Sequence, residues 1–271
     1  PWLLGFLVFQ LYPLCASLYY AFTDYSVTNT PTFVGLKNFI TMFTDDPLFF
    51  KSLITTLKYV FMSLPLKIIS ALVVALILNQ KIRGINFYRT IYYIPSIFGG
   101  SVAIAILWRF LFMDSGLVNR LLKMIHLPSV PWLSSPKVAL FTLSLLSVWQ
   151  FGSSMVLFLA ALKQVPEDLY EAARIGGGGP VRTFFSITLP MITPILFFNI
   201  LMQLVNAFQD FTGAFVITNG GPLNSTYLFA LKLYDEAFTY YKVGYACALS
   251  WVLFVMILLF ITGLMVFFAV T

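Results

Sequence analysis

Long apolar runs dominate the chain and predict membrane-spanning helices. A spanning helix needs about 20 mostly apolar residues to cross roughly 30 Å of hydrocarbon. Six stretches meet this requirement: residues 1–23, 59–78, 90–108, 138–162, about 192–217 and 243–271. All but the second and fifth are free of Asp, Glu, Lys and Arg, whereas the second contains Lys67 and the fifth contains Asp210. We therefore predict an all-α, polytopic membrane protein with six transmembrane helices.

Composition supports this class and excludes others. Hydrophobic residues make up 60% of the 271 residues and charged residues only 10%, against about 25% in a soluble domain. The formal charge of +6 suits anionic headgroups or ligands, but no basic run is long enough to hold nucleic acid. With no fixed-period repeat and no linker, we expect one membrane domain over residues 1–271, and we interpret Pro1 as the trimmed start of a membrane helix.

The distribution of basic residues predicts the orientation of the helices in the membrane. Loops 79–89 and 163–188 carry six Lys or Arg in 37 residues, with Lys81 among them, whereas loops 24–51, 113–137 and 218–242 carry seven in 78. Positive loops stay in the cytoplasm. We therefore expect the first pair of loops to be cytoplasmic and the other three to face outward.

The second of these cytoplasmic loops contains signals for two short helices. Pro166 at a first helical position, acidic residues after it, Arg174 in the last turn and glycine from Gly176 predict a helix of about three turns. A second helix is expected to begin at Pro180 and to end before Pro190. One face of the predicted helix carries Leu169, Ala172, Ala173 and Gly176. Most of these residues are small, which allows close approach by another protein. A docking element and a surface hairpin without a partner both fit this pattern.

The spacing of this loop resembles a known family. Glu171-Ala172-Ala173, Gly177, Ile187 and Leu189-Pro190 match the EAA loop of permease subunits in binding-protein-dependent type I ABC importers. Gly176 departs from the family pattern, where Asp often precedes the glycine. Three further segments resemble the carbohydrate-uptake branch, of the maltose and glycerol-phosphate type: residues 33–39, 89–95 and 218–222.

The resemblance implies the partners and the function of the chain. In this family the loop, here about 163–190, couples to a cytoplasmic ATPase, which implies coupling roles for Glu171, Ala172, Ala173 and Gly177. The implied assembly has two ATP-binding subunits, a second permease subunit forming a heterodimer, and an extracytoplasmic solute-binding protein. It would import carbohydrate by alternating access across the cytoplasmic or inner membrane of a bacterium or archaeon.

The chain lacks the residues needed for bond chemistry of its own. No GxxxxGK followed by Ser or Thr is present, so ATP and Mg²⁺ are expected on the partner ATPase subunits and no cofactor on this chain. The single histidine, His126, stands in a predicted external loop without metal-ligand spacing and is expected to be a surface residue. We predict no metal site, no catalytic residue and no enzymatic activity.

Polar residues inside the apolar runs mark a candidate substrate path, because such groups are costly in a bilayer. Asn199, Gln203, Asn206 and Asp210 recur at helical spacing, with Gln209 beside them. Amides and carboxylates can bind sugar hydroxyls, and Phe208 and Phe211 offer flat faces to a sugar ring. The fourth run adds Ser147, Gln150, Phe151 and Ser154. By resemblance, these residues fall where carbohydrate permeases contact substrate, although hydrogen bonds between helices remain the alternative, above all for Asn199.

Lys67 presents a separate question, because it lies near the centre of a predicted span. A water-filled cavity, a charge pair with Asp210 and an anionic substrate such as a uronate oligosaccharide or a sugar phosphate each fit its position. An ion-coupled secondary transporter of a small polar solute would use Lys67 and Asp210 as coupling charges, but it would not need the docking loop. A scaffold or receptor would leave the polar residues unexplained.

Overall fold

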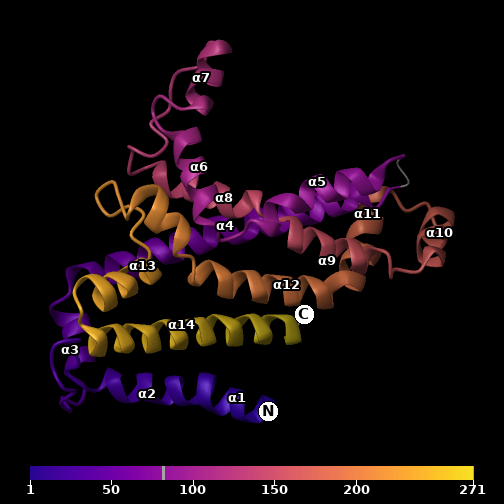
Figure 1. The fold of residues 1–271 in the computed structure, drawn as a ribbon. Helices are drawn as coiled ribbons and strands as arrows, with labels where there is room; N and C mark the ends of the chain where they lie inside the picture. Colours follow the sequence, from indigo (N-terminus) through magenta and orange to yellow (C-terminus); the bar gives the residue numbers. More distant parts are fainter. Residues whose placement is uncertain (81–82, 271) are drawn as a thin grey trace. The chain divides into compact units, whose positions relative to one another are not determined.

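The computed structural model describes residues 1–80 and 83–270 (Figure 1), so Lys81, used above for orientation, lies outside the described residues. The described part of the chain consists of helices and connecting loops, with two isolated β-bridges in the loop that follows residue 21. It forms two compact units, residues 1–58 with 208–271 and residues 59–207, and each is described here by itself.

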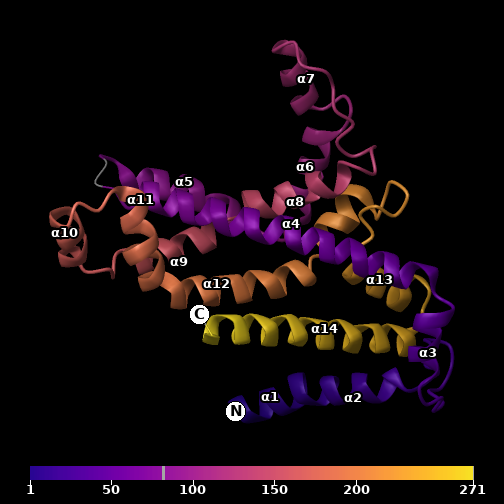
Figure 2. The same ribbon diagram turned by 180° about the vertical axis from the view of Figure 1, so that it is seen from behind.

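The first unit combines the two ends of the chain. Its elements, in which η marks a single π-helical turn, are α1 (Trp2–Phe6), η1 (Leu7–Leu11), α2 (Tyr12–Ala21), α3 (Lys37–Thr44), the start of α4 (Pro47–Leu78), η3 (Ala214–Thr218), α13 (Phe229–Tyr234), η4 (Asp235–Thr239) and α14 (Val243–Val270). The helix α14 runs alongside α2 in both views (Figures 1 and 2).

Two residues hold the end of α2 against its neighbours in this unit. A Cβ at Gly244 would collide with the carbonyl oxygen of Thr23, so only glycine allows this approach of α14. The amide of Asn38 in α3 donates to the carbonyl oxygens of Ala21 and Thr23, both at 2.9 Å. These bonds satisfy backbone groups that the end of a helix leaves unpaired.

The second unit contains the middle of the chain. It comprises the rest of α4, α5 (Ile85–Ile97), α6 (Val102–Phe112), α7 (Leu117–Met124), α8 (Ala139–Trp149), α9 (Gly152–Leu162), α10 (Glu167–Ile175), α11 (Pro180–Thr183), η2 (Phe184–Thr188) and most of α12 (Leu189–Phe208). Its core is formed where α4, α9 and α12 meet, with Ala71, Ala75, Met155, Phe158 and Ile192 almost fully buried.

Most predicted spans correspond to helices in the structure. Five helical segments are long and apolar enough to cross a membrane, and the pair α8 and α9, bent by 46°, forms a sixth if it is counted as one span. The second span is longer than predicted, because it begins at Pro47 rather than at residue 59.

Two spans differ from the prediction. The stretch 90–108 is not one helix: α5 ends at Ile97, Gly100 adopts a φ of 73°, and the span in the structure is Val102–Met124. The stretch 192–217 is also interrupted, because α12 ends at Phe208 and residues 209–211 are not helical. Apolar composition predicted both runs but gives no sign of a local break at glycine or polar residues.

Candidate functional site

The predicted coupling loop forms a helical hairpin. The helix α10 (Glu167–Ile175) carries Glu167 and Asp168 in its first turn and has Gly176 as its C-cap, as predicted, but Pro166 is its N-cap rather than its first helical residue. Gly177 follows with a φ of 72°, a conformation that favours glycine. The second helix starts at Pro180 as predicted but does not end before Pro190. It continues through the π-helical turn η2 into α12, and Pro190 lies just after that turn.

Short hydrogen bonds close this hairpin and leave one face open. The backbone N–H of Gly178 donates to the carbonyl of Ala173 at 2.8 Å, and the hydroxyls of Tyr170 and Thr188 lie 3.1 Å apart. The side chains of Glu171 and Ala172 are exposed and that of Ala173 is half-buried. The hairpin therefore presents a carboxylate beside small residues, and the four predicted coupling residues lie on one element and its terminating turn.

A cavity of about 730 Å³ lies behind the same hairpin, within the second unit. Tyr170 and Arg174 of α10 line one side, and Leu76 at the end of α4 and Phe184 of η2 line others. The hairpin is thus attached to the membrane helices over only part of its length. The rest of its surface is available to another protein.

The predicted path residues on the fourth span surround a break between two helices. Ser147, Gln150 and Phe151 are half-buried and Ser154 is buried. At the break, the hydroxyl of Ser96 donates to the carbonyl of Gln150 at 3.0 Å and accepts from the backbone N–H of Ser153 at 3.1 Å. Ser96 therefore satisfies backbone groups that an unbroken helix would pair, which is what a break inside a bilayer requires.

Glycine allows α5 to approach this break. A Cβ at Gly152 would lie 2.5 Å from the carbonyl oxygen of Tyr92 and 2.8 Å from the Ser96 hydroxyl. The ring of Phe151 packs against Tyr92, with centroids 6.0 Å apart. The break is thus held in one geometry, with Gln150 and Phe151 at its corner.

The polar stripe on α12 divides into a packed part and an exposed part. Asn199 and Gln203 are buried, and the Asn199 amide donates to the Ser154 carbonyl at 3.2 Å. This bond between helices favours a packing role for Asn199. Asn206 is exposed. One helix carries these three residues at the predicted spacing.

The stripe does not continue to Asp210 on the same helix. Gln209 is exposed and Asp210 is half-buried, and both lie in the non-helical segment after Phe208. Phe208 is buried and packs on Phe260, with ring centroids 5.2 Å apart, so its ring is occupied by packing. Extending helical spacing across this break was wrong, because the segment departs from the helix that the spacing assumes.

The remaining predicted path residue, Lys67, lies half-buried in α4, two residues after a proline inside that helix. Ser63, one turn before it, is buried. The predicted path residues are divided between the two units. The second unit contains Lys67, Asn206 and the residues of α8 and α9, and the first unit contains Phe208, Gln209 and Asp210.

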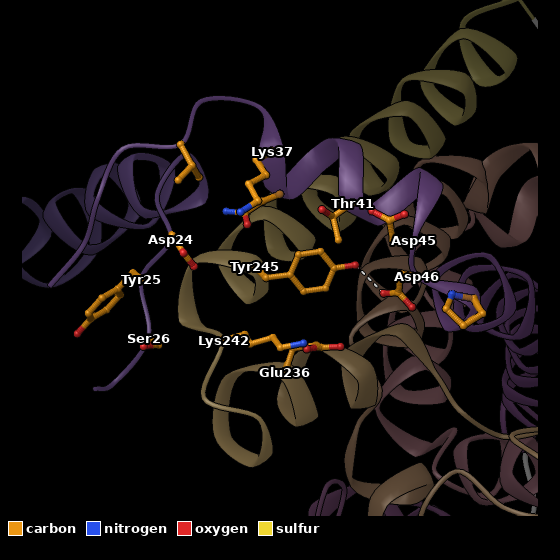
Figure 3. A pocket seen from close by; sticks show the side chains of 13 residues that line it. Asp24, Tyr25, Ser26, Lys37, Thr41, Asp45, Asp46, Glu236, Lys242 and Tyr245 are labelled. Carbon is orange, nitrogen blue, oxygen red and sulfur yellow. Dashed lines mark hydrogen bonds between the residues drawn. The ribbon is translucent and has the colours of Figure 1, made fainter. Parts of the chain in front are cut away.

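Sequence reasoning missed a buried ionic cluster in the first unit. Lys232 of α13 is 1% exposed, and its ammonium lies 2.6 Å from Asp46 and 3.1 Å from Glu236. Figure 3 shows Asp46 and Glu236 together with Tyr245. The Tyr245 hydroxyl donates to the same oxygen of Asp46 at 2.5 Å. These charges lie in loops that were predicted to face outward, and no cluster was predicted among them. The spacing of Lys232 and Glu236 on one helical face, inside an apolar segment, was the available signal.

Asp46 also determines where α4 begins. Asp46 directly precedes Pro47, the first residue of α4. Its other carboxylate oxygen accepts a hydrogen bond from the backbone N–H of Leu48, in the first turn of that helix, at 3.0 Å. Burial raises the pKa of Asp46, but the hydrogen bonds from Lys232 and Tyr245 and the charge of Lys232 outweigh burial and hold the pKa below its ordinary value. Asp46 is therefore a carboxylate at neutral pH.

Several apolar spans, a helix break within one of them and an exposed helical hairpin are typical of a multi-pass transport subunit. The chain belongs to the family of inner membrane components of binding-protein-dependent transport systems, whose sequence model matches residues 40–271. It is a membrane permease subunit of an ABC importer and not an enzyme, as predicted.

Individual relatives cover nearly the whole chain. "Probable ABC transporter permease protein YesP" of Bacillus subtilis is 47% identical over 95% of this chain and 84% of its own length. The sn-glycerol-3-phosphate permease protein UgpA of Yersinia pestis is 35% identical over 93% of this chain and 85% of its own. The fold also matches a crystal structure of a bacterial alginate ABC transporter, with a TM-score of 0.83, 22% identity and coverage of 97% and 90%.

Proposed function

We propose that this permease subunit moves a carbohydrate from an extracytoplasmic solute-binding protein across the cytoplasmic (inner) membrane by alternating access. Two partner subunits bind ATP and Mg²⁺ and drive the change, and a second permease subunit supplies the other half of the path, as a heterodimer. Residues 1–271 act as one transmembrane domain with its coupling loop at about 163–190. Substrate and nucleotide each favour one of two global states of the complex.

The observation that carries the proposal is the open face of the α10 hairpin. It presents Glu171 beside Ala172 and Ala173, on the loop that charge distribution assigns to the cytoplasm. An exposed carboxylate with small neighbours fits a cleft on another protein. An ion-coupled secondary transporter has no use for such a face.

The test is a reconstituted assay. The chain is assembled with its partner permease and ATPase subunits in lipid nanodiscs, and ATP hydrolysis is measured with candidate solute-binding proteins loaded with different sugars. We expect one binding protein with its sugar to stimulate hydrolysis. Sugar uptake into vesicles that needs an ion gradient and proceeds without ATP would support the secondary transporter instead.

For the substrate path we predict that Gln209→Ala and Asp210→Asn change transport more than assembly. Both side chains follow α12, and neither is fully buried, so a sugar hydroxyl can reach them. Losing one hydrogen bond of about 0.5–1.5 kcal/mol raises the half-saturating sugar concentration about 2- to 13-fold. Uptake kinetics and the yield of assembled complex are measured together.

Asn199→Ala is the contrasting variant. The hydrogen bond from the Asn199 amide to the Ser154 carbonyl joins two helices, so we expect its removal to reduce assembly. If the first two variants also lose assembly while the surviving complex transports normally, their role is packing.

For ligand charge we predict that Lys67→Gln impairs an acidic substrate more than a neutral one. An ammonium near the bilayer centre costs about 3 kcal/mol on insertion scales, so an anionic sugar group is one way to offset it. The name of the relative UgpA assigns it an anionic substrate, sn-glycerol-3-phosphate. Uptake of neutral and of acidic oligosaccharides is compared between the wild-type transporter and the Lys67→Gln variant. Equal loss of both indicates a structural charge, and unchanged acidic uptake removes the hypothesis.

A further inference from the structure

A cavity of about 450 Å³ opens beside the ionic cluster of the first unit (Figure 3). Its walls come from the loop after α2, from α3, from the junction of α3 and α4, from η4 and from the start of α14. This is polar space: Asp24, Asp45, Asp46 and Glu236 line it, together with Lys37 and Lys242. The substrate path proposed above does not use these residues.

One carboxylate oxygen in the wall has an unused hydrogen-bonding capacity. Glu236 is 8% exposed, and its Oε1 accepts from Lys232. Its Oε2 is buried and has no hydrogen-bond partner among the described residues. A charged acceptor that is buried and unpaired is costly, so an arrangement that leaves one open calls for a donor.

The charge balance of the cluster determines the kind of donor. Lys232 faces two carboxylates, Asp46 and Glu236, so the buried group carries one uncompensated negative charge. Around the cavity, four carboxylates stand against three lysines when Lys232 is included. A cation is therefore favoured and an anionic sugar is disfavoured.

The shape and ligand set favour a long organic cation over a metal ion. Within residues 1–80 and 83–270 no group of three or more His, Cys, Asp or Glu could hold a metal. The cavity is far larger than a bare ion and lies within the range of pockets that bind extended groups. An arginine or lysine side chain, with a cationic group on an aliphatic stem, can enter such a space. Its guanidinium or ammonium group can then donate a hydrogen bond to a carboxylate in the cavity wall.

We propose that this cavity receives one arginine or lysine side chain of the solute-binding protein when that protein docks, with Glu236 as its acceptor. The inference rests on the proposed function. It commits to this partner because loops 24–51 and 218–242, which build the cavity, are the loops that the positive-inside rule assigns to the outer side. The π-helical turn η4 places Glu236 at the cavity, and such turns are frequent at functional positions.

The test measures docking on the whole transporter in nanodiscs, using the binding protein that stimulates its ATPase. Glu236→Gln keeps the size of the side chain and leaves Lys232 and Asp46 as a balanced pair, so we expect it to assemble. We expect the Kd of the loaded binding protein to rise about tenfold, as for loss of a charged hydrogen bond, with ATPase activity at saturation unchanged. The matched control is Asp235→Asn, which removes a negative charge at the residue before Glu236. The carboxylate of Asp235 already accepts a hydrogen bond from the Tyr227 hydroxyl at 2.8 Å. This variant should change Kd less than about twofold.

A second variant keeps the inference testable if Glu236→Gln fails to assemble. Thr41 of α3 lines the cavity, so Thr41→Arg supplies a guanidinium from the chain itself while every carboxylate remains. We expect it to weaken docking to a similar extent by occupying the space.

A double-mutant cycle separates contact from indirect effects. Each arginine and lysine on the docking face of the binding protein is replaced by alanine, and one replacement should weaken docking to wild type but not to Glu236→Gln. Equal Kd values for wild type, Glu236→Gln and Thr41→Arg would overturn the pocket assignment while the proposed function stands. A wild-type complex that no solute-binding protein binds or stimulates would remove the proposed function, and the pocket assignment with it.

Discussion

Glu171→Lys and Gly177→Val are expected to reduce ATP-driven uptake by about tenfold or more while the subunit stays inserted in the membrane. Reversing the exposed carboxylate on α10 would remove the proposed charged contact to the ATPase and introduce repulsion, which costs about 2 kcal/mol or more at an interface. Valine at Gly177 must adopt a φ of 72°, which costs about 1–3 kcal/mol and shifts the turn that ends α10.

Uptake and copurification of the ATPase subunit are measured for both variants. Glu171→Asp keeps the charge and should retain most uptake. Gly179→Val is the control for the turn, because Gly179 has a φ of −70° and open space around its Cβ position. Uptake and ATPase binding at wild-type levels in Glu171→Lys and Gly177→Val would refute the coupling role of the hairpin.

Lys232→Met is expected to destabilise the first unit by about 3–5 kcal/mol, because it leaves Asp46 and Glu236 as buried carboxylates without their cation. Methionine matches the aliphatic stem of lysine, so the loss comes from charge rather than from volume. The thermal unfolding temperature of the detergent-solubilised complex reports the change. Lys242→Met removes an exposed lysine from the same unit and should stay within about 0.5 kcal/mol.

Neutralising the whole cluster gives a sharper version of this test. Asp46→Asn and Glu236→Gln, added to Lys232→Met, remove the buried charges together, and we expect much of the lost stability to return. A Lys232→Met variant as stable as wild type would contradict the stabilising role of Lys232 between the two buried carboxylates.

Apolar patterning predicted the helical class and most spans, because a bilayer demands long uncharged helices regardless of tertiary detail. Start and stop residues also predicted α10 correctly, since Pro166 and Gly176 act through local backbone geometry. The breaks after Ile97, Trp149 and Phe208 were missed. The break after Trp149 is held by a neighbouring element, as the Ser96 bonds at Gln150 and Ser153 show, and periodicity along one helix carries no such information.

The ionic cluster was missed for a related reason. Lys232 and Glu236 are close in sequence, but Asp46 lies near the other end of the chain and meets them only in the folded unit. Charged residues are exposed in most proteins, so the pattern alone does not predict a buried cluster. The coupling residues could be predicted because their spacing is local and resembles a known family.

The division of the chain into units has a consequence for biosynthesis. Residues 1–58 leave the ribosome before residues 59–207, but the segment they pack with, residues 208–271, is made after them. The continuous stretch 59–207 can complete its own contacts before α14 is available to α2 and before Lys232 is available to Asp46. Synthesis of α14 thus completes the packing of residues 1–58, and translation that stops before residue 208 leaves them without their packing partner.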